Sequence, residues 1–144
     1  MIAKELDLPI IVHDRQSKGD TLKVLKDMNV TKGVIHCFSG SAETAKILIN
    51  MGFMISFTGV ITFKNAKRAI EALKVIPIER LMIETDSPYM APEPFRGRRN
   101  DSRYVKYVAE KMAEVKGIEL EQLCEITYQN GLKFFNITKE ENIQ

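Results

Sequence analysis

Three residues of the types that bind metal ions each follow an apolar run expected to form a strand. His13 and His36, which are the two histidines of the chain, come directly after such runs, and Asp86 lies just beyond the run 81–83. Neutral imidazole nitrogens and an anionic carboxylate oxygen are the ligands that a divalent ion takes in hydrolases. Backbone hydrogen bonds to the histidines and capping of a turn by Asp86 would explain each residue taken alone. Because both histidines occupy the same structural position, the pattern favours a metal site.

Two further charged residues are expected at the same place. Glu84 is an alternative ligand or base, but it precedes Asp86 by two residues and should lie on the same face of the sheet, one layer deeper. Arg15, two residues after His13, would project toward the same opening and could bind a phosphate through its guanidinium fork. A salt bridge to Asp14 or Glu84 is the simpler interpretation of Arg15. A bound divalent ion at such a site could lower the pKa of a water molecule and polarise a phosphoryl or carbonyl oxygen.

A basic cluster follows this region within eleven residues, and it consists of Arg96, Arg98, Arg99, Arg103 and Lys106. Clustered cations separated by small residues are typical of a surface that contacts phosphates, although a solvated loop has the same composition. Ser39 and Ser41 flank Gly40 before an expected helix, where hydroxyl and amide groups suit an anion. Helix capping alone explains Ser41.

The elements that position these residues alternate along the chain. Expected strands cover 8–12, 33–38, 53–59 and the run from 81, and expected helices cover 21–28 with Asp20 as cap, 42–51 with Ser41 as cap, 65–75, 102–116 and 120–135. Strand and helix repeats of this kind build a parallel sheet with helices outside it. In such α/β sheets the ligand site lies at the carboxyl ends of the strands, which places His13, His36 and Asp86 at a common edge.

Composition limits the remaining possibilities. The 144 residues, 44% of them hydrophobic, suit one domain, which we expect at 1–137 with a frayed tail at 138–144. The net charge of +2 means that any nucleic-acid footprint is local. Two cysteines without a CxxC motif favour reduced thiols in a cytoplasm. The apolar runs are too short for a membrane span, and the first residues do not have the pattern of a signal peptide.

Four segments together resemble the TatD-type metal-dependent deoxyribonucleases, a branch of the amidohydrolase-like barrels: 8–15, 34–41, 84–89 and 96–100. The resemblance extends from about Met1 to Ile137. It implies a DNA substrate and a pair of divalent ions, Mg, Mn or Zn. His13 and His36 would bind one ion, whereas Asp86 would bind the other and act as the base toward the attacking water. The substrate-binding residues implied at this site are Arg15, Ser39, Arg98, Arg99 and Asn100.

The members of that family are (β/α)8 barrels with an HxH pair on strand one and a bridging glutamate on strand four, and this chain has neither. Its repeats therefore correspond to strands five to eight, the C-terminal half of a TIM-type barrel. We expect the half-barrel to be completed by a missing N-terminal half, or by a second copy that closes an eight-stranded barrel about a two-fold axis. The alternatives are a non-catalytic half-barrel that binds nucleic acid or a partner chain, and a related hydrolase acting on C–N or C–O bonds.

Overall fold

The computed structural model describes residues 2–14, 17 and 19–137 of the chain. It contains one parallel sheet with the strand order β1-β2-β3-β4. The strands are β1 (Ile10–His13), β2 (Gly33–His36), β3 (Met54–Phe57) and β4 (Leu81–Ile83). His13 pairs with His36 in the register of β1 and β2, so the carboxyl ends of these strands lie level. The predicted α/β fold with a parallel sheet is confirmed, and its being half of a larger barrel stays a prediction.

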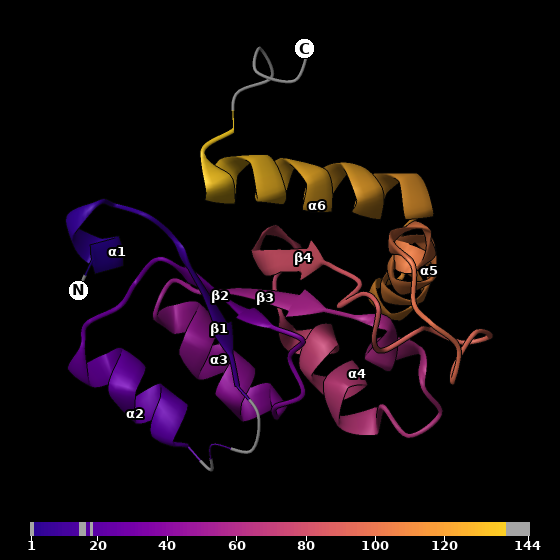
Figure 1. The fold of residues 1–144 in the computed structure, drawn as a ribbon, viewed down its shortest axis with the longest axis horizontal. Coiled ribbons are helices and arrows are strands. Elements are labelled where there is room, and N and C mark those ends of the chain that lie inside the picture. Colours follow the sequence, from indigo (N-terminus) through magenta and orange to yellow (C-terminus); the bar gives the residue numbers. More distant parts are fainter. Residues whose placement is uncertain (1, 15–16, 18, 138–144) are drawn as a thin grey trace.

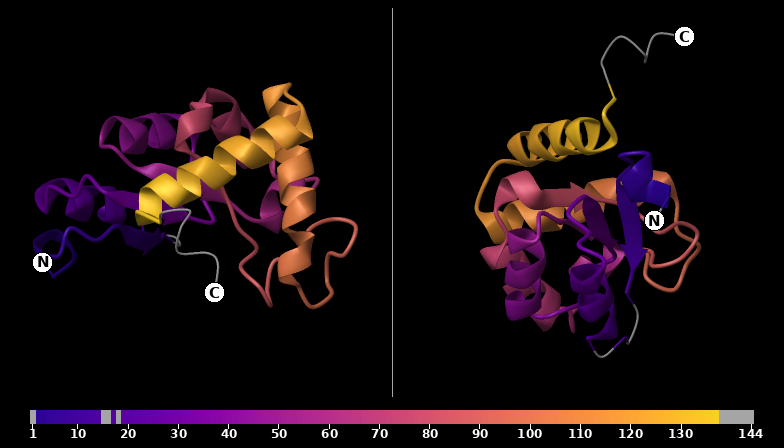
Figure 2. Two further views of the ribbon diagram at one scale, coloured as in Figure 1. Left: turned by 90° about the horizontal axis from the view of Figure 1, so that it is seen from above. Right: turned by 90° about the vertical axis from the view of Figure 1, so that its left-hand side faces the viewer.

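Helices connect and cover the strands. They are α1 (Ile2–Glu5), α2 (Asp20–Asp27), α3 (Ala42–Asn50), α4 (Lys67–Val75), α5 (Val105–Lys116) and α6 (Leu120–Phe135), with short 3-10 helices η1 (Gly59–Thr62), η2 (Ile78–Arg80) and η3 (Ser102–Tyr104). Figure 1 shows α2, α3 and α4 along one side of the sheet and α6 beyond β4. Figure 2 shows α5 and α6 running in sharply different directions from the corner where they join.

Burial explains why the central strands are apolar along their whole length. All four residues of β3 are buried, as expected for a parallel strand covered on both faces. Its neighbours in the core include Phe53, Leu73 and Leu81, each inaccessible to solvent. Burying a side chain of this size stabilises the fold by about 1.5 to 3 kcal/mol. The core therefore holds the centre of the sheet rigidly beneath the edge where the strands end.

Helix starts agree with the sequence in some places and differ in others. Ser41 caps α3 as predicted, since its hydroxyl accepts a hydrogen bond from the Thr44 amide at 3.2 Å. The prediction that Asp20 caps α2 is wrong, because the helix begins at Asp20 and the preceding residue, Gly19, provides no side-chain cap. The predicted helix from residue 102 begins with the 3-10 turn η3, capped by Asp101.

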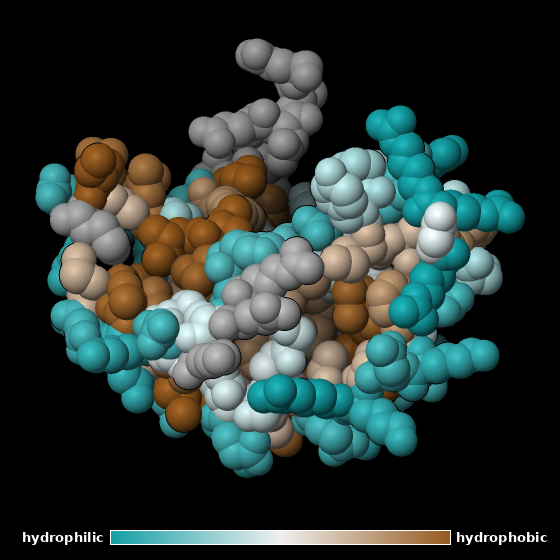
Figure 3. Space-filling view, turned by 60° about the horizontal axis from the view of Figure 1, so that its bottom comes forward, coloured by the Kyte–Doolittle hydropathy of each residue, from teal (hydrophilic) through white to brown (hydrophobic). Residues whose placement is uncertain are grey.

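The sheet has two free edges within the described part of the chain, formed by β1 and β4. On the first, Ile11 is 64% exposed. Beside the second, an apolar groove of about 450 Å³ runs between β4 and α6, lined among others by Met82, Tyr128 and Phe135. Figure 3 shows apolar side chains gathered on the left of the molecule, where α1 and β1 lie in Figure 1, and long hydrophilic side chains on the right. None of the helices described is long and apolar enough to cross a membrane.

Candidate functional site

The imidazole of His36 is held in one orientation by a carboxylate. Its Nδ1 lies 2.6 Å from Oε2 of Glu84, and both side chains are largely buried, with exposed fractions of 16% and 27%. A carboxylate only accepts hydrogen bonds, so Nδ1 of His36 carries a proton, and Nε2 lies on the side of the ring away from Glu84. Nε2 is 3.4 Å from Oδ1 of Asp86. Metal-binding histidines commonly have this arrangement, in which one ring nitrogen donates to a carboxylate and the other faces the site.

Glu84 itself is fixed by the ends of two strands. Its Oε1 accepts a hydrogen bond from the Cys37 amide at 2.7 Å and another from the Ser56 hydroxyl. The side chains of Glu84 and Asp86 are 27% and 31% exposed, and the prediction that Glu84 lies one layer deeper stays a prediction. These contacts occupy both of its oxygens with protein donors, so Glu84 positions His36. The sequence considered it only as an alternative ligand or base.

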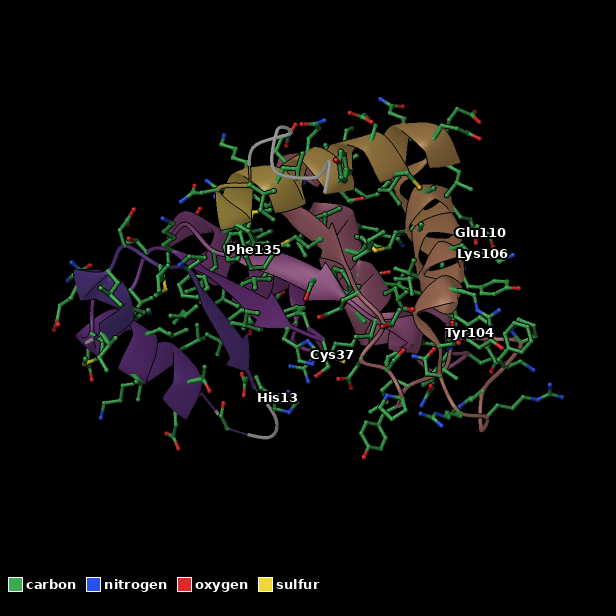
Figure 4. All side chains as sticks on the ribbon, turned by 45° about the horizontal axis from the view of Figure 1, so that its top comes forward. His13, Cys37, Tyr104, Lys106, Glu110 and Phe135 are labelled. Carbon is green, nitrogen blue, oxygen red and sulfur yellow. The ribbon has the colours of Figure 1, made fainter. Side chains whose placement is uncertain are left out.

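His13 lies beside His36 at the same edge of the sheet. The two rings are tilted by 32° with their centroids 5.3 Å apart, and the His13 side chain is exposed. Figure 4 shows His13 at the end of β1 and Cys37 at the end of β2, both at the carboxyl end of the sheet. The structure therefore brings together the two histidines and Asp86, which the sequence singled out. Their roles as metal ligands stay predictions.

These side chains do not by themselves make up a metal site. Across the described residues, no group of three or more histidine, cysteine, aspartate or glutamate side chains is placed to hold an ion. The histidine and carboxylate donors at this edge nevertheless have the chemistry that a divalent ion takes in hydrolases. His36 and Asp86 face one another, and the exposed ring of His13 stands next to them. The donor set fits a divalent ion, and completing its shell requires further ligands.

Two residues at this edge have left-handed backbone conformations, Cys37 with φ 48° and Asp86 with φ 56°. Conformations of this kind cost about 1 to 3 kcal/mol each and persist where neighbouring contacts enforce them. The Cys37 amide binds Glu84, and its Sγ lies 3.1 Å from Oγ1 of Thr58. The Asp86 carbonyl accepts a hydrogen bond from the Tyr89 amide at 2.9 Å. Burial raises the pKa of the Cys37 thiol, and the charges of Glu84 and Asp86 raise it further although Thr58 opposes them, so the thiol is protonated at neutral pH.

Asn100 holds the turn that carries Asp86. Its side-chain amide donates to the carbonyls of Thr85 at 2.7 Å and Tyr89 at 2.6 Å, and its backbone amide donates to Pro88 at 2.9 Å. The residue is only 4% exposed. Both protons of the side-chain amide are thus bonded within the protein. A buried amide without hydrogen-bond partners would destabilise the fold. Asn100 therefore positions the turn, and its predicted contact with substrate stays a prediction.

The segment 90–100 is fastened to the protein over its first part. A side chain at Gly59 would collide with the Met90 carbonyl, so glycine permits this close approach. Farther along, the Glu93 amide donates to Oγ1 of Thr62 at 2.8 Å. The ring of Phe95 then stacks on Tyr104 with centroids 4.3 Å apart, and Figure 4 places Tyr104 on the surface near the start of α5. The arginines that follow are therefore attached to a segment whose first part is held by these contacts.

The basic cluster separates into arginines with and without close partners. The Arg96 guanidinium lies 4.2 Å from the ring centre of Phe63, and Arg103 forms a 2.8 Å ion pair with Asp101. Lys106 lies 4.8 Å from the ring centre of Tyr107. Arg98 and Arg99 are exposed, and no ion pair or ring contact is seen for either among the described residues. This division narrows the predicted phosphate-binding surface to Arg98 and Arg99.

A second recess lies near the histidines, with a volume of about 680 Å³. Its walls include Asp14, Ser39, Gly40, Thr44 and Arg68. Ser39 is exposed there, next to the first turn of α3, as the sequence predicted. The predicted contact between Ser39 and substrate stays a prediction. Arg15, the other substrate-binding candidate of this region, lies outside the described residues.

Comparison with known proteins identifies the family to which this site belongs. Residues 1–136 match the model of the TatD related DNase family. The chain belongs to this family. Its relatives include the uncharacterized metal-dependent hydrolase YabD of Bacillus subtilis, 48% identical over 94% of this chain and 54% of the relative, and YcfH of Escherichia coli, 46% identical over 94% and 52%. This chain spans about half the length of both.

Solved structures from the same family share this fold over the part that matches this chain. A TatD homologue from Escherichia coli, YjjV, superposes with a TM-score of 0.88 at 28% identity, over 95% of this chain and 53% of that one. A TatD family hydrolase from Entamoeba histolytica gives a TM-score of 0.84 at 27% identity, over 95% and 54%. The resemblance seen in the sequence motifs is therefore confirmed.

Sequence reasoning missed the contribution of Ser56, whose hydroxyl binds Glu84. The sequence did contain a sign of this role, since Ser56 is the single polar residue in the otherwise apolar strand β3. A buried hydroxyl in such a strand needs a hydrogen-bond partner. The role of Asn100 had no comparable signal, because the carbonyls that it binds come from a turn whose shape the sequence does not specify.

Proposed function

We propose that this chain contributes the His13, His36 and Asp86 side of a divalent-metal site in a hydrolase that cleaves phosphodiester bonds in DNA. A bound Mg²⁺, Mn²⁺ or Zn²⁺ would activate a water molecule and polarise the phosphoryl oxygen. Asp86 would accept the proton of the attacking water at its carboxylate, while the imidazoles of His13 and His36 supply nitrogen ligands. The relatives named as metal-dependent hydrolases support this proposal.

One observation carries it, namely that Glu84 holds Nδ1 of His36 at 2.6 Å while Nε2 faces Asp86 at 3.4 Å. Metal-binding histidines commonly donate their second ring N–H to a carboxylate, which fixes the ring and strengthens the ligand. A histidine that served only the fold would need no carboxylate directed at it on the other side. The arrangement is therefore better suited to a ligand than to a structural ion pair.

The substrate class is proposed from the residues around this site. Arg98 and Arg99 are exposed beyond the Asp86 turn, and guanidinium groups bind phosphate oxygens through paired hydrogen bonds. The family description names a DNase, which agrees with a phosphodiester substrate. The two free cysteines suit a reducing compartment, so we place the protein in the cytoplasm.

Metal binding gives the first test. Calorimetric titration of Mn²⁺ into the wild type should show weak binding, because the shell is incomplete, and His13→Ala and His36→Ala should abolish it. Glu114→Gln removes one carboxylate charge from the surface of α5, far from the strand ends, and serves as the control. Equal binding by the wild type and His36→Ala would refute the metal assignment.

Activity gives the second test and separates the main proposal from a non-catalytic half-barrel. Incubating the chain with labelled DNA and Mg²⁺ or Mn²⁺ should yield metal-dependent cleavage that Asp86→Asn removes. DNA binding without cleavage by the wild type would favour the binding module. The binding module is retained as a second candidate function because this chain matches only about half the length of its relatives.

A further inference from the structure

Tyr89 is the most exposed aromatic side chain among the described residues, with 70% of its surface accessible. It lies three residues after Asp86. Exposed apolar side chains occur singly on most protein surfaces and require no explanation by themselves. What distinguishes Tyr89 is its attachment to the candidate site.

The backbone of Tyr89 is fixed on both sides of its side chain. Its amide donates to the Asp86 carbonyl at 2.9 Å, and its carbonyl accepts the Asn100 side-chain amide at 2.6 Å. The same turn carries Asp86, so Tyr89 and Asp86 belong to one hydrogen-bonded turn. An exposed aromatic ring on a fixed backbone can offer its face to a flat ligand.

The arginines available for phosphate lie next to this turn. Asn100 donates its backbone amide to Pro88 at 2.9 Å, and Arg98 and Arg99 immediately precede it in the chain. An aromatic face and two cations therefore flank the turn that carries Asp86. Proteins that bind unpaired nucleic-acid strands combine these two elements, because each base has a face for stacking and each phosphate attracts a cation.

We propose that Tyr89 stacks on an unpaired nucleobase adjacent to the phosphodiester presented to Asp86, while Arg98 and Arg99 bind the phosphate backbone. This inference rests on the proposed function and adds the chemical class of its substrate contact, a nucleobase that is not paired in a duplex. Stacking on an aromatic ring should strengthen binding about 5- to 150-fold, which corresponds to about 1 to 3 kcal/mol per base.

Fluorescence anisotropy with a labelled oligodeoxythymidylate tests the proposal, with EDTA present so that no cleavage occurs. Tyr89→Ala should weaken binding of this oligonucleotide about 5- to 150-fold, and Tyr89→Phe should bind like the wild type because the ring is retained. The matched control is Tyr128→Ala, which removes an exposed tyrosine from α6. Circular dichroism confirms that each variant is folded.

A second oligonucleotide with abasic sites identifies the bases as the groups recognised. Wild type and Tyr89→Ala should bind it about equally, since no base is present to stack. An equal loss on both oligonucleotides, or no loss from Tyr89→Ala on either, would overturn the stacking role.

The proposed function can survive that result, because binding that still depends on Arg98 and Arg99 would show a phosphate contact without stacking. If the wild type binds neither oligonucleotide, the stacking role and the DNA substrate both fail. A salt dependence left unchanged by Tyr89→Ala supports stacking, because removal of a neutral ring displaces no counterion.

Discussion

Replacement of Glu84 by glutamine should invert the tautomer of His36 while leaving the fold intact. The side-chain amide of glutamine has one oxygen and one nitrogen in place of two carboxylate oxygens. Its oxygen would keep the acceptor position toward the Cys37 amide and the Ser56 hydroxyl, since the opposite orientation sets donors against donors. Its NH₂ group would then donate to Nδ1 of His36, which moves the imidazole proton to Nε2.

The magnitude follows from the contacts at Glu84. Glu84→Gln replaces the charge-assisted hydrogen bond of 2.6 Å to His36, and those from Cys37 and Ser56, by neutral ones, whereas bonds to charged groups contribute about 1.5 to 3 kcal/mol each. Because about a quarter of the Glu84 side chain reaches solvent, water compensates part of the loss, and we expect the free energy of unfolding to fall by about 2 kcal/mol. Metal affinity should fall about 10- to 100-fold, as for other changes to groups that orient a ligand.

Two of the three measurements need no metal. Urea unfolding gives the stability change, nitrogen-15 NMR of the imidazole ring identifies which nitrogen carries the proton, and Mn²⁺ calorimetry gives the affinity. The control Glu114→Gln makes the same chemical change at an exposed ion pair with Lys111, which should contribute less than about 1 kcal/mol. Retention of the Nδ1–H tautomer in Glu84→Gln together with wild-type stability would refute this account of the site.

Three other outcomes are expected. The double variant Arg98→Ala/Arg99→Ala should reduce the slope of log K against log salt concentration for single-stranded DNA binding by about 1.4, which is about 0.7 for each phosphate that is no longer neutralised. An unchanged slope would show that these arginines are solvated and make no phosphate contact. The hydrogen bond from Arg103 lowers the pKa of Asp101 in the folded protein below its ordinary value of 3.8. The ionised Asp101 carboxylate therefore stabilises the fold above pH 3.8, and this stabilisation is lost as the pH falls through the pKa of the folded state. Asp101→Asn should therefore unfold at lower urea than the wild type at pH 7 and at nearly the same urea well below pH 3.8. Pairing of the free β1 edge of one copy with the β4 edge of another predicts a dimer of about twice the 16.4 kDa chain mass in light scattering, whereas a well-folded monomer would exclude this closure.

Elements with a strong local pattern were predictable. The helix α6 was expected at residues 120–135 and spans Leu120–Phe135, because its apolar residues recur at the helical period over four turns. The strands were found in the right order but with shorter limits, such as Met54–Phe57 in place of 53–59. Strand ends depend on pairing with neighbours, and apolar flanking residues such as Phe53 are buried without pairing.

The site was predictable as a location and less so as a set of contacts. Parallel strands bring their ends together, so His13, His36 and Asp86 could be assigned to one edge from their positions alone. The partner of His36 is 48 residues away in sequence, and only the folded sheet shows which oxygen of Glu84 it binds. Similarly, the partner of Arg96 is the ring of Phe63, which no local spacing indicates.

The hydrogen bonds of Asn100 have a consequence for how this part of the protein can change. The segment from Arg96 to Arg99 lies between two fixed points, the Phe95 ring stacked on Tyr104 and the buried amide of Asn100. We expect replacement of residues 97–99 to leave the turn that carries Asp86 in place, whereas replacement of Arg96 also removes its contact with Phe63. If residues 96–99 bind substrate as proposed, we expect that grafting another sequence between residues 96 and 99 would change substrate preference while leaving Asp86 in place.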